Sequence, residues 1–279
     1  MTKKKMLSYI DLSSPIHSLT GASKFIIFIL WSVLVMVSFE TPILLVLAVL
    51  GIVFFIISKI KFKDVSFIIK MMSVFLVLNL AAIYLFSPEN AVSIYNTRNV
   101  IIDGPTRFTL TWEQIFYEFN VFLKYITIIP PALLLMTTTH PSEFAASLNK
   151  IGVPYTISYS VSLTLRYIPD VQRDFEAIYQ SQQARGLELS GKASVFKRIK
   201  RTVPLLLPLI LSSLARIDII SRAMELRGFG KNKKRTWYSE KPFKKKDILS
   251  IIITVLLFTA GIIYTFYDGN RFFNPFIIK

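Results

Sequence analysis

The sequence predicts an all-α integral membrane protein, with about five transmembrane helices and a large cytoplasmic helical region between the fourth and the fifth. The chain is 53% hydrophobic and has a mean hydropathy of +0.52, which is more than a soluble chain of 279 residues needs for its core. Its formal charge of +16 is typical of a membrane protein with basic cytoplasmic loops. Together, these observations indicate a helical protein whose main solvent is the bilayer.

Residues 1–139 contain the first four apolar runs, each close to or above the roughly 17 residues that a spanning helix requires. We expect the first run to be a retained helix rather than a signal peptide, because no small-residue cleavage site follows it. The runs are Ala22–Val37, Pro42–Ile57, Phe67–Phe86 and Thr111–Met136.

Local signals add detail to this N-terminal part. Thr111-x-x-Gln114 is a capping box at the start of the fourth run. Pro130 and Pro131 should kink that helix without ending it, provided that neighbouring helices bind the carbonyls that the prolines free. Before it, Val100–Thr109 has a turn signal between β-forming residues, which predicts a small hairpin.

Residues 140–247 differ in character, because they are basic and their apolar residues are interrupted by polar ones. Proline and acidic residues at helix starts and glycines just past helix ends predict three helices here. These are Pro141–Gly152, Pro169–Arg185 and Val203–Arg227, with a basic bridge at Lys192–Arg201 and a lysine-rich linker at Lys231–Lys246. A last apolar run, Ile248–Tyr267, follows in residues 248–279 and predicts a final span with a short tail.

The leucine-rich part Val203–Ile220 is ambiguous between a span and a surface helix. Pro204, Pro208, Arg216 and Asp218 interrupt it, so we interpret it as a helix lying against the cytoplasmic face of the membrane. A spanning helix is the alternative. The count of crossings favours the surface position, because five spans satisfy the charge pattern of the loops and one added crossing would not.

Orientation follows from the distribution of lysine and arginine. The N-terminus, the Lys59–Lys63 loop and residues 140–247 are rich in these residues, whereas Ser87–Leu110 and the C-terminal tail are poor in them. The positive-inside rule therefore places the first three in the cytoplasm and the last two outside.

Two helices in the basic region end in the same way. Ala184-Arg185-Gly186 closes one and Leu226-Arg227-Gly228 closes the other, with the arginines 42 residues apart (227 − 185). Glycine stops a helix and a nearby arginine suits the negative end of its dipole, so a single instance would indicate only a cap. The recurrence in a basic segment indicates more, because guanidinium groups fork onto carboxylates in an acidic groove of a partner.

No catalytic group, metal site or cofactor site is predicted. The chain has no cysteine and only two histidines, His17 and His140, and it lacks the glycine-rich loop that cradles nucleotide phosphates. Asp170 and Asp174 have the spacing of metal-binding aspartates in lipid-modifying membrane enzymes. Because no second acidic pair accompanies them, we interpret both as ion-paired residues on a cytoplasmic helix.

The linker also raises the question of nucleic acid. Trp237, Tyr238 and Phe243 lie among its lysines, as aromatic residues do in some nucleic-acid binders. A basic stretch beside a membrane span more commonly contacts anionic lipid. We therefore expect the lipid bilayer as a partner and no nucleic acid.

The two Arg-Gly motifs, with Leu163-x-x-Arg166-Tyr-Ile-Pro169 upstream, resemble the transmembrane T component of energy-coupling factor (ECF) transporters, a family that includes CbiQ-like cobalt and nickel transport subunits. The resemblance is close over Thr138–Gly230 and extends to the flanking spans in pattern only. Leu226 departs from the family, which usually has a second alanine there.

The resemblance implies a multi-pass subunit of the cell membrane, without catalysis of its own and with a cytoplasmic N-terminus. Such a subunit couples two cytoplasmic ABC-type ATPases to a small substrate-binding membrane protein (S component) that takes up a vitamin or a metal ion. Residues 140–247 would be its coupling domain, and Arg185 and Arg227 would each enter a groove of one ATPase.

Two other functions remain open from the sequence. Glu143-Phe-Ala-Ala-Ser-Leu-Asn-Lys-Ile-Gly152 loosely resembles the coupling loop of a permease subunit in an ordinary ABC importer. That loop occurs once, whereas the Arg-Gly helix ends occur twice. The second alternative, a lipid-modifying membrane enzyme, rests on Asp170 and Asp174 alone.

Overall fold

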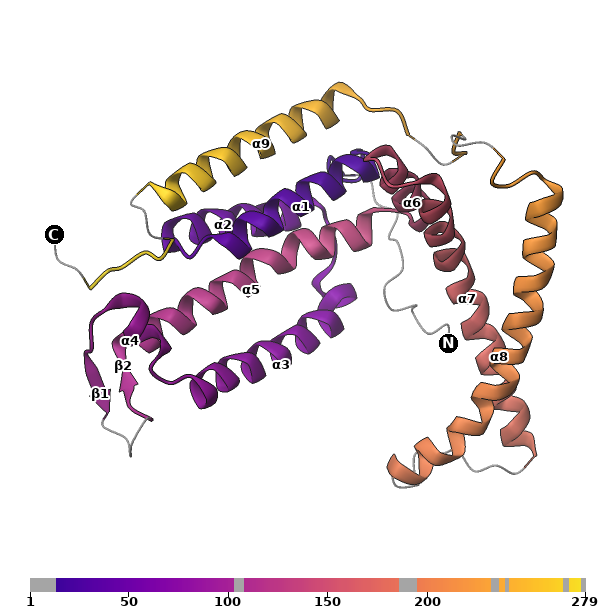
Figure 1. Ribbon diagram of the computed structural model, residues 1–279, viewed down its shortest axis with the longest axis horizontal. Coiled ribbons are helices and arrows are strands. Elements are labelled where there is room, and N and C mark those ends of the chain that lie inside the picture. Colours follow the sequence, from indigo (N-terminus) through magenta and orange to yellow (C-terminus); the bar gives the residue numbers. More distant parts are fainter. Residues whose placement is uncertain are drawn as a thin grey trace. The chain divides into compact units, whose positions relative to one another are not determined.

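The structure is a computed structural model that describes residues 14–102, 108–185, 195–231, 236–238, 241–267 and 271–276 (Figure 1). The chain forms two compact units. The first comprises Met1–His140 with Lys241–Lys279, and the second comprises Pro141–Glu240.

The first unit is built from long apolar helices. Its helices are α1 (Gly21–Val37), α2 (Thr41–Ile57), α3 (Phe62–Phe86), α4 (Asn90–Tyr95), α5 (Trp112–Thr138) and α9 (Lys245–Phe266). Strands β1 (Val100–Ile102) and β2 (Leu110–Thr111) pair antiparallel, which confirms a hairpin here, although its second strand begins one residue after the predicted end at Thr109. The turn of this hairpin lies outside the described residues.

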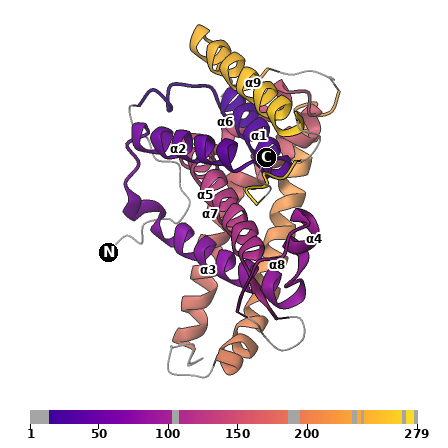
Figure 2. The same ribbon diagram turned by 90° about the vertical axis from the view of Figure 1, so that its left-hand side faces the viewer.

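The core of this unit lies where α1 packs between α5 and α9 and where α2 packs on α5. Figures 1 and 2 both show α9 running alongside α1. A buried cluster fills the contact: Trp31, Leu34, Val35, Leu44, Leu47 and Leu123. A Cβ at Gly261 would come within 2.9 Å of the Leu34 side chain, so this glycine permits the close approach of α9 to α1.

The two prolines lie inside α5, as expected. Pro130 and Pro131 lack N–H groups, so the Thr127 carbonyl cannot receive a hydrogen bond from the residue three or four positions later. The Trp31 indole N–H donates to that carbonyl at 3.1 Å from α1. A neighbouring helix thus supplies a hydrogen bond to the Thr127 carbonyl. This is the condition under which we expected the helix to continue through the two prolines.

The N-termini of α1 and α9 meet at one carboxylate. Asp247 is fully buried and accepts hydrogen bonds from the Thr20 N–H at 2.7 Å, the Ser23 hydroxyl at 2.7 Å and the Lys244 N–H at 2.8 Å. One carboxylate therefore caps two helices, and it fixes the start of α9 against the start of α1.

The second unit contains α6 (Pro141–Lys150), α7 (Tyr155–Ala184) and α8 (Val195–Leu226). The predicted start of the middle helix at Pro169 is wrong, because α7 runs for 30 residues with Pro169 inside it. A proline removes one hydrogen bond and the helical pattern continues on both sides of it. The basic bridge is also partly wrong, because helix α8 begins at Val195; lysine and arginine are good helix formers.

The lengths and composition of the helices support the predicted multi-pass membrane protein. Among the described residues, four helices are long and apolar enough to cross a membrane: α3, α5, α9 and the Val203–Leu226 part of α8. Helices α1 and α2 are apolar but shorter, at 17 residues each. The count of five spans and the surface position of Val203–Ile220 therefore stay predictions.

Candidate functional site

The first Arg-Gly motif follows the C-terminus of α7. Ala184 is the last helical residue, and the Arg185 N–H donates to the Ser181 carbonyl at 3.2 Å. The Arg185 side chain is exposed, and Gly186 lies outside the described residues. Arg185 is therefore presented at a helix end, in the position that the sequence predicted.

The second motif ends α8 with a well-defined stop. Gly228 has a φ of +66°, the Gly228 N–H donates to the Glu225 carbonyl at 2.9 Å, and the Phe229 N–H donates to the Met224 carbonyl at 3.0 Å. This pair of hydrogen bonds is the Schellman arrangement, which favours glycine because a Cβ is strained at positive φ. Leu226, just before the exposed Arg227, is 90% exposed.

The two motifs lie at opposite ends of the α7 and α8 pair. Arg185 follows the C-terminus of α7, whereas Phe229, two residues after Arg227, packs on Tyr155 and Tyr159 at the N-terminus of α7. The helices are therefore antiparallel, with the two arginines at opposite ends of the pair. The sequence predicted both ends but not this opposition, which depends on how the helices pack.

An aromatic cluster holds the end of the second motif. The ring of Phe229 lies 4.7 Å from that of Tyr159 and 5.8 Å from that of Tyr155, and Trp237 lies 5.3 Å from Tyr155. The Trp237 indole N–H donates to the Asn149 side-chain oxygen at 3.1 Å, which ties the cluster to α6. The packing of Trp237 differs from the expectation that this residue lies in a juxtamembrane linker. The aromatic spacing Tyr155-x-x-x-Tyr159, on one helix face, was the available signal.

The polar residues of α7 and α8 are paired in the way that the sequence suggested. Asp170 pairs with Arg173 at 3.5 Å on the same helix, and Asp174 pairs with Arg216 of α8 at 2.7 Å. These four side chains and Tyr167 line a polar cavity of about 310 Å³. Within the described ranges, no three acidic or histidine side chains gather as metal ligands would.

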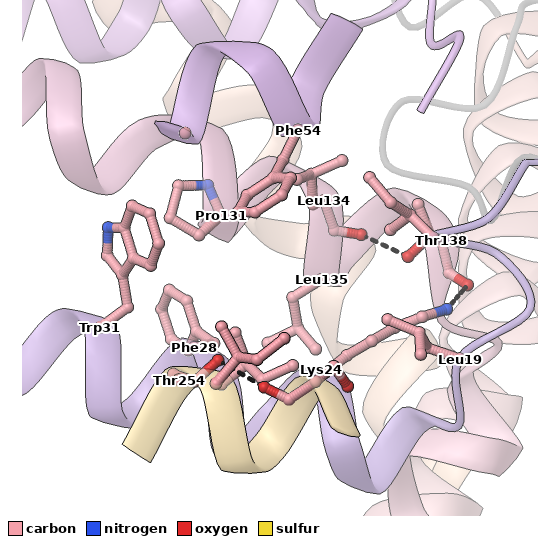
Figure 3. Close-up of a pocket in the computed structure, with 15 residues that line it drawn as sticks. Leu19, Lys24, Phe28, Trp31, Phe54, Pro131, Leu134, Leu135, Thr138 and Thr254 are labelled. Carbon is pink, nitrogen blue, oxygen red and sulfur yellow. Dashed lines mark hydrogen bonds between the residues drawn. The ribbon is translucent and has the colours of Figure 1, made fainter. Parts of the chain in front are cut away.

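A second cavity, of about 270 Å³, lies inside the first unit between α1, α2, α5 and α9 (Figure 3). Its walls are mainly apolar, with Trp31, Phe54 and Leu134 among them. The Lys24 ammonium at its edge donates to the Thr138 carbonyl at 2.9 Å, at the C-terminus of α5. The Thr138 hydroxyl is also engaged, since it donates to the Leu134 carbonyl. This lysine therefore has a structural role as a helix cap.

The chain combines apolar helices able to cross a membrane with a helical unit that presents two arginines. This combination indicates a multi-pass membrane protein that acts within a larger assembly. A family model described as cobalt transport protein (CbiQ) matches residues 12–238. The chain belongs to this family and is an EcfT/CbiQ-like T component of ECF transporters.

Relatives named energy-coupling factor transporter transmembrane protein EcfT support this placement. The protein from Limosilactobacillus fermentum is 32% identical over 155 residues, which cover 51% of this chain and 58% of the relative. The one from Streptococcus thermophilus is 30% identical over 171 residues, covering 58% and 64%. The one from Lactococcus lactis subsp. cremoris is 32% identical over 159 residues, covering 53% and 59%. The matches thus span less than two thirds of these relatives.

Proposed function

We propose that this chain couples two cytoplasmic ABC-type ATPases to a small substrate-binding membrane subunit, the S component, during uptake of a vitamin or a metal ion. The chain has no catalysis of its own in this role and acts as a scaffold. One observation supports the proposal above others: α7 and α8 end in exposed Arg185 and Arg227 at opposite ends of an antiparallel pair. One protein could thereby engage two partners at once.

The chemistry of arginine suits this task. A guanidinium group stays charged and forms two parallel hydrogen bonds to a carboxylate, so a helix end with an arginine fits an acidic groove on a partner. Movement of the two ATPases on ATP binding and hydrolysis would carry both helix ends with it, as in other rigid-body transitions. Residues 140–247 act as the cytoplasmic coupling domain in this proposal, with the N-terminus on the same side.

The alternatives have less support. A lipid-modifying enzyme would need Asp170 and Asp174 available for metal ions, whereas both carboxylates are paired with arginines. An ordinary ABC permease would bind its ATPase through the turn at the end of α6, near Gly152. Gly152 has a φ of +106°, which is what a glycine that simply ends a helix adopts.

Alanine and lysine variants of both arginines test the proposal in the reconstituted complex. Arg185→Ala and Arg227→Ala should each weaken ATPase binding by about 2–5 kcal/mol, because the partner's carboxylates are left buried and unpaired. Lysine should rescue poorly, since it keeps the charge but loses the two-point geometry. The measurements are co-purification of the ATPases and substrate uptake by proteoliposomes.

The control is Arg98→Ala, which removes an exposed arginine from the first unit, where it pairs with Glu89 at 3.2 Å. If the arginines are only helix caps, the loss would be about 0.3–1 kcal/mol and lysine would substitute freely. Normal assembly and uptake in the Arg185→Ala/Arg227→Ala double variant would reject the proposal.

A further inference from the structure

One ion pair joins the two helices that end in Arg185 and Arg227. The Arg216 guanidinium of α8 donates to the Asp174 carboxylate of α7 at 2.7 Å, and the two side chains are 36% and 32% exposed. Figure 1 shows these two helices crossing. The pair therefore links α7 and α8 directly, away from both of their C-terminal ends.

The position of the pair along each helix is the same. Asp174 precedes Arg185 by 11 residues (185 − 174), and Arg216 precedes Arg227 by 11 residues (227 − 216). Each interval is helical up to its arginine, so each arm from the ion pair to the arginine is about 16 Å long. Nothing in helix geometry requires equal arms, and their equality places the pair midway between the two candidate docking ends.

Arg216 also contacts α7 at a defined position along the axis of that helix. Its guanidinium carbon lies 6.0 Å from the centre of the Tyr167 ring, while its nitrogen bonds Asp174. Tyr167 and Asp174 are seven residues apart, which is two helical turns on one face of α7. Because the guanidinium lies between these two contacts, a slide of α8 along α7 would break one of them.

Apolar packing is a weak constraint on this crossing. Among the described side chains of the two helices, Ser158 is buried on α7 and Leu205 on α8, while most of the others are half-buried or exposed. Apolar contacts are also non-directional and would tolerate sliding. A charge-assisted hydrogen bond is directional, and buried polar residues set the register of helices in some coiled coils.

We propose that Asp174 and Arg216 are positioning residues that fix the crossing point of α7 and α8, and thereby the distance between Arg185 and Arg227. The consequence of this inference for transport rests on the proposed function. The distance between Arg185 and Arg227 affects transport only if the two ATPases bind at these two helix ends. With the pair intact, displacement of one end is passed to the other. Without it, each helix follows its own ATPase.

The first test measures the geometry in the full-length chain without partners. The chain has no cysteine, so spin labels can be introduced at the exposed positions Gln183 and Glu225, beside the two arginines. We expect one narrow distance distribution in the parent chain and a broad or shifted one in Asp174→Arg and in Asp174→Asn. The charge swap Asp174→Arg/Arg216→Asp should restore the narrow distribution.

Glu176→Arg is the matched control, because it makes the same charge change on α7 at an exposed position outside the cavity that Asp174 and Arg216 line. The control should leave the distribution narrow. A narrow, unshifted distribution in both Asp174→Arg and Asp174→Asn would overturn the inference. So would a charge swap that folds, as judged by a single peak in size-exclusion chromatography, but fails to restore the parent distance.

The second test measures uptake by proteoliposomes that contain the whole complex. Asp174→Arg and Asp174→Asn should keep both ATPases bound, since Arg185 and Arg227 are intact, but lower uptake roughly tenfold, within the usual range for coupling between sites. The charge swap should recover uptake, and parent-level uptake in both single variants would contradict the inference. The spin-label result is independent of the ATPases, so the two proposals can fail separately: normal uptake in Arg185→Ala/Arg227→Ala rejects the function and leaves the measured crossing unchanged.

Discussion

Single residues in the first unit satisfy backbone groups that other residues leave without partners. Trp31 of α1 binds the Thr127 carbonyl, which faces two prolines where an N–H donor would otherwise be. Lys24 of α1 binds the Thr138 carbonyl at the end of α5, and Lys124 of α5 binds the Met36 carbonyl near the end of α1 at 3.0 Å. Such cross-helix bonds matter in a bilayer, because no water is present there to replace them.

At the residue scale, we predict that Trp31→Phe destabilises the chain and that Pro131→Ala partly reverses the loss. Phenylalanine keeps the ring but removes the donor, which leaves a buried carbonyl unsatisfied at a cost of about 1–3 kcal/mol. Alanine at position 131 returns a backbone N–H four residues after Thr127. The double-mutant cycle is measured from the thermal unfolding midpoints of the variants in detergent. Trp112→Phe is the matched control, because Trp112 is 56% exposed. Additive effects of the two changes would contradict the role assigned to the indole.

At the scale of elements, the C-terminal stop of α8 determines where the chain goes after Arg227. The Schellman stop at Gly228 turns the chain so that Phe229 returns to the N-terminus of α7. The aromatic cluster with Trp237 then fixes that return. The orientation of Arg227 thus depends on residues on both sides of it.

We therefore predict that Gly228→Ala weakens ATPase binding although Arg227 is retained. A side chain at a φ of +66° costs about 1–2 kcal/mol, and the end of α8 would relax to avoid it. Gly228→Asn is the matched variant, because asparagine tolerates the left-handed conformation, and it should bind the ATPases nearly as the parent does. Equal binding by the alanine and asparagine variants would show that the stop does not position the arginine. Co-purification at graded salt concentrations would report the difference.

At the scale of the whole molecule, function depends on which side of the membrane each segment faces. The basic segments predict that residues before and after α8 share the cytoplasmic side, and the two arginines can engage two cytoplasmic ATPases only in that arrangement. The Val203–Leu226 part of α8 is nevertheless long and apolar enough to cross a membrane. Its position is thus a decisive feature of the proposed function.

Cysteine labelling in intact cells tests this topology in a chain that has no cysteine of its own. Single cysteines at the exposed positions Ser93, Ser181 and Lys231 report helix α4, the end of α7 and the segment after α8. We expect an impermeant thiol reagent to label Ser93→Cys directly, and to label the other two only after permeabilisation. Direct labelling of Lys231→Cys together with protection of Ser181→Cys would show that α8 crosses the membrane and would contradict the five-span prediction.

The sequence alone determined the features that depend on neighbouring residues. Apolar runs located the long helices of the first unit, a capping residue placed the start of α5 at Thr111, and glycine placed the stop of α8 at Gly228. Two short motifs also indicated the CbiQ-like family, and the match of the family model to residues 12–238 confirms it. Each of these signals lies within a few residues along the chain, where helix geometry is sufficient to interpret it.

Only the tertiary structure decided which distant groups meet. The sequence showed that Pro130 and Pro131 free carbonyls but not that Trp31 binds one, and it showed two arginine ends but not that they lie at opposite ends of an antiparallel pair. It identified Asp174 as ion-paired without naming Arg216 on another helix. Local helix propensity does not predict such partners, because they depend on how the helices cross. The crossing is set by side chains that are far apart in the chain.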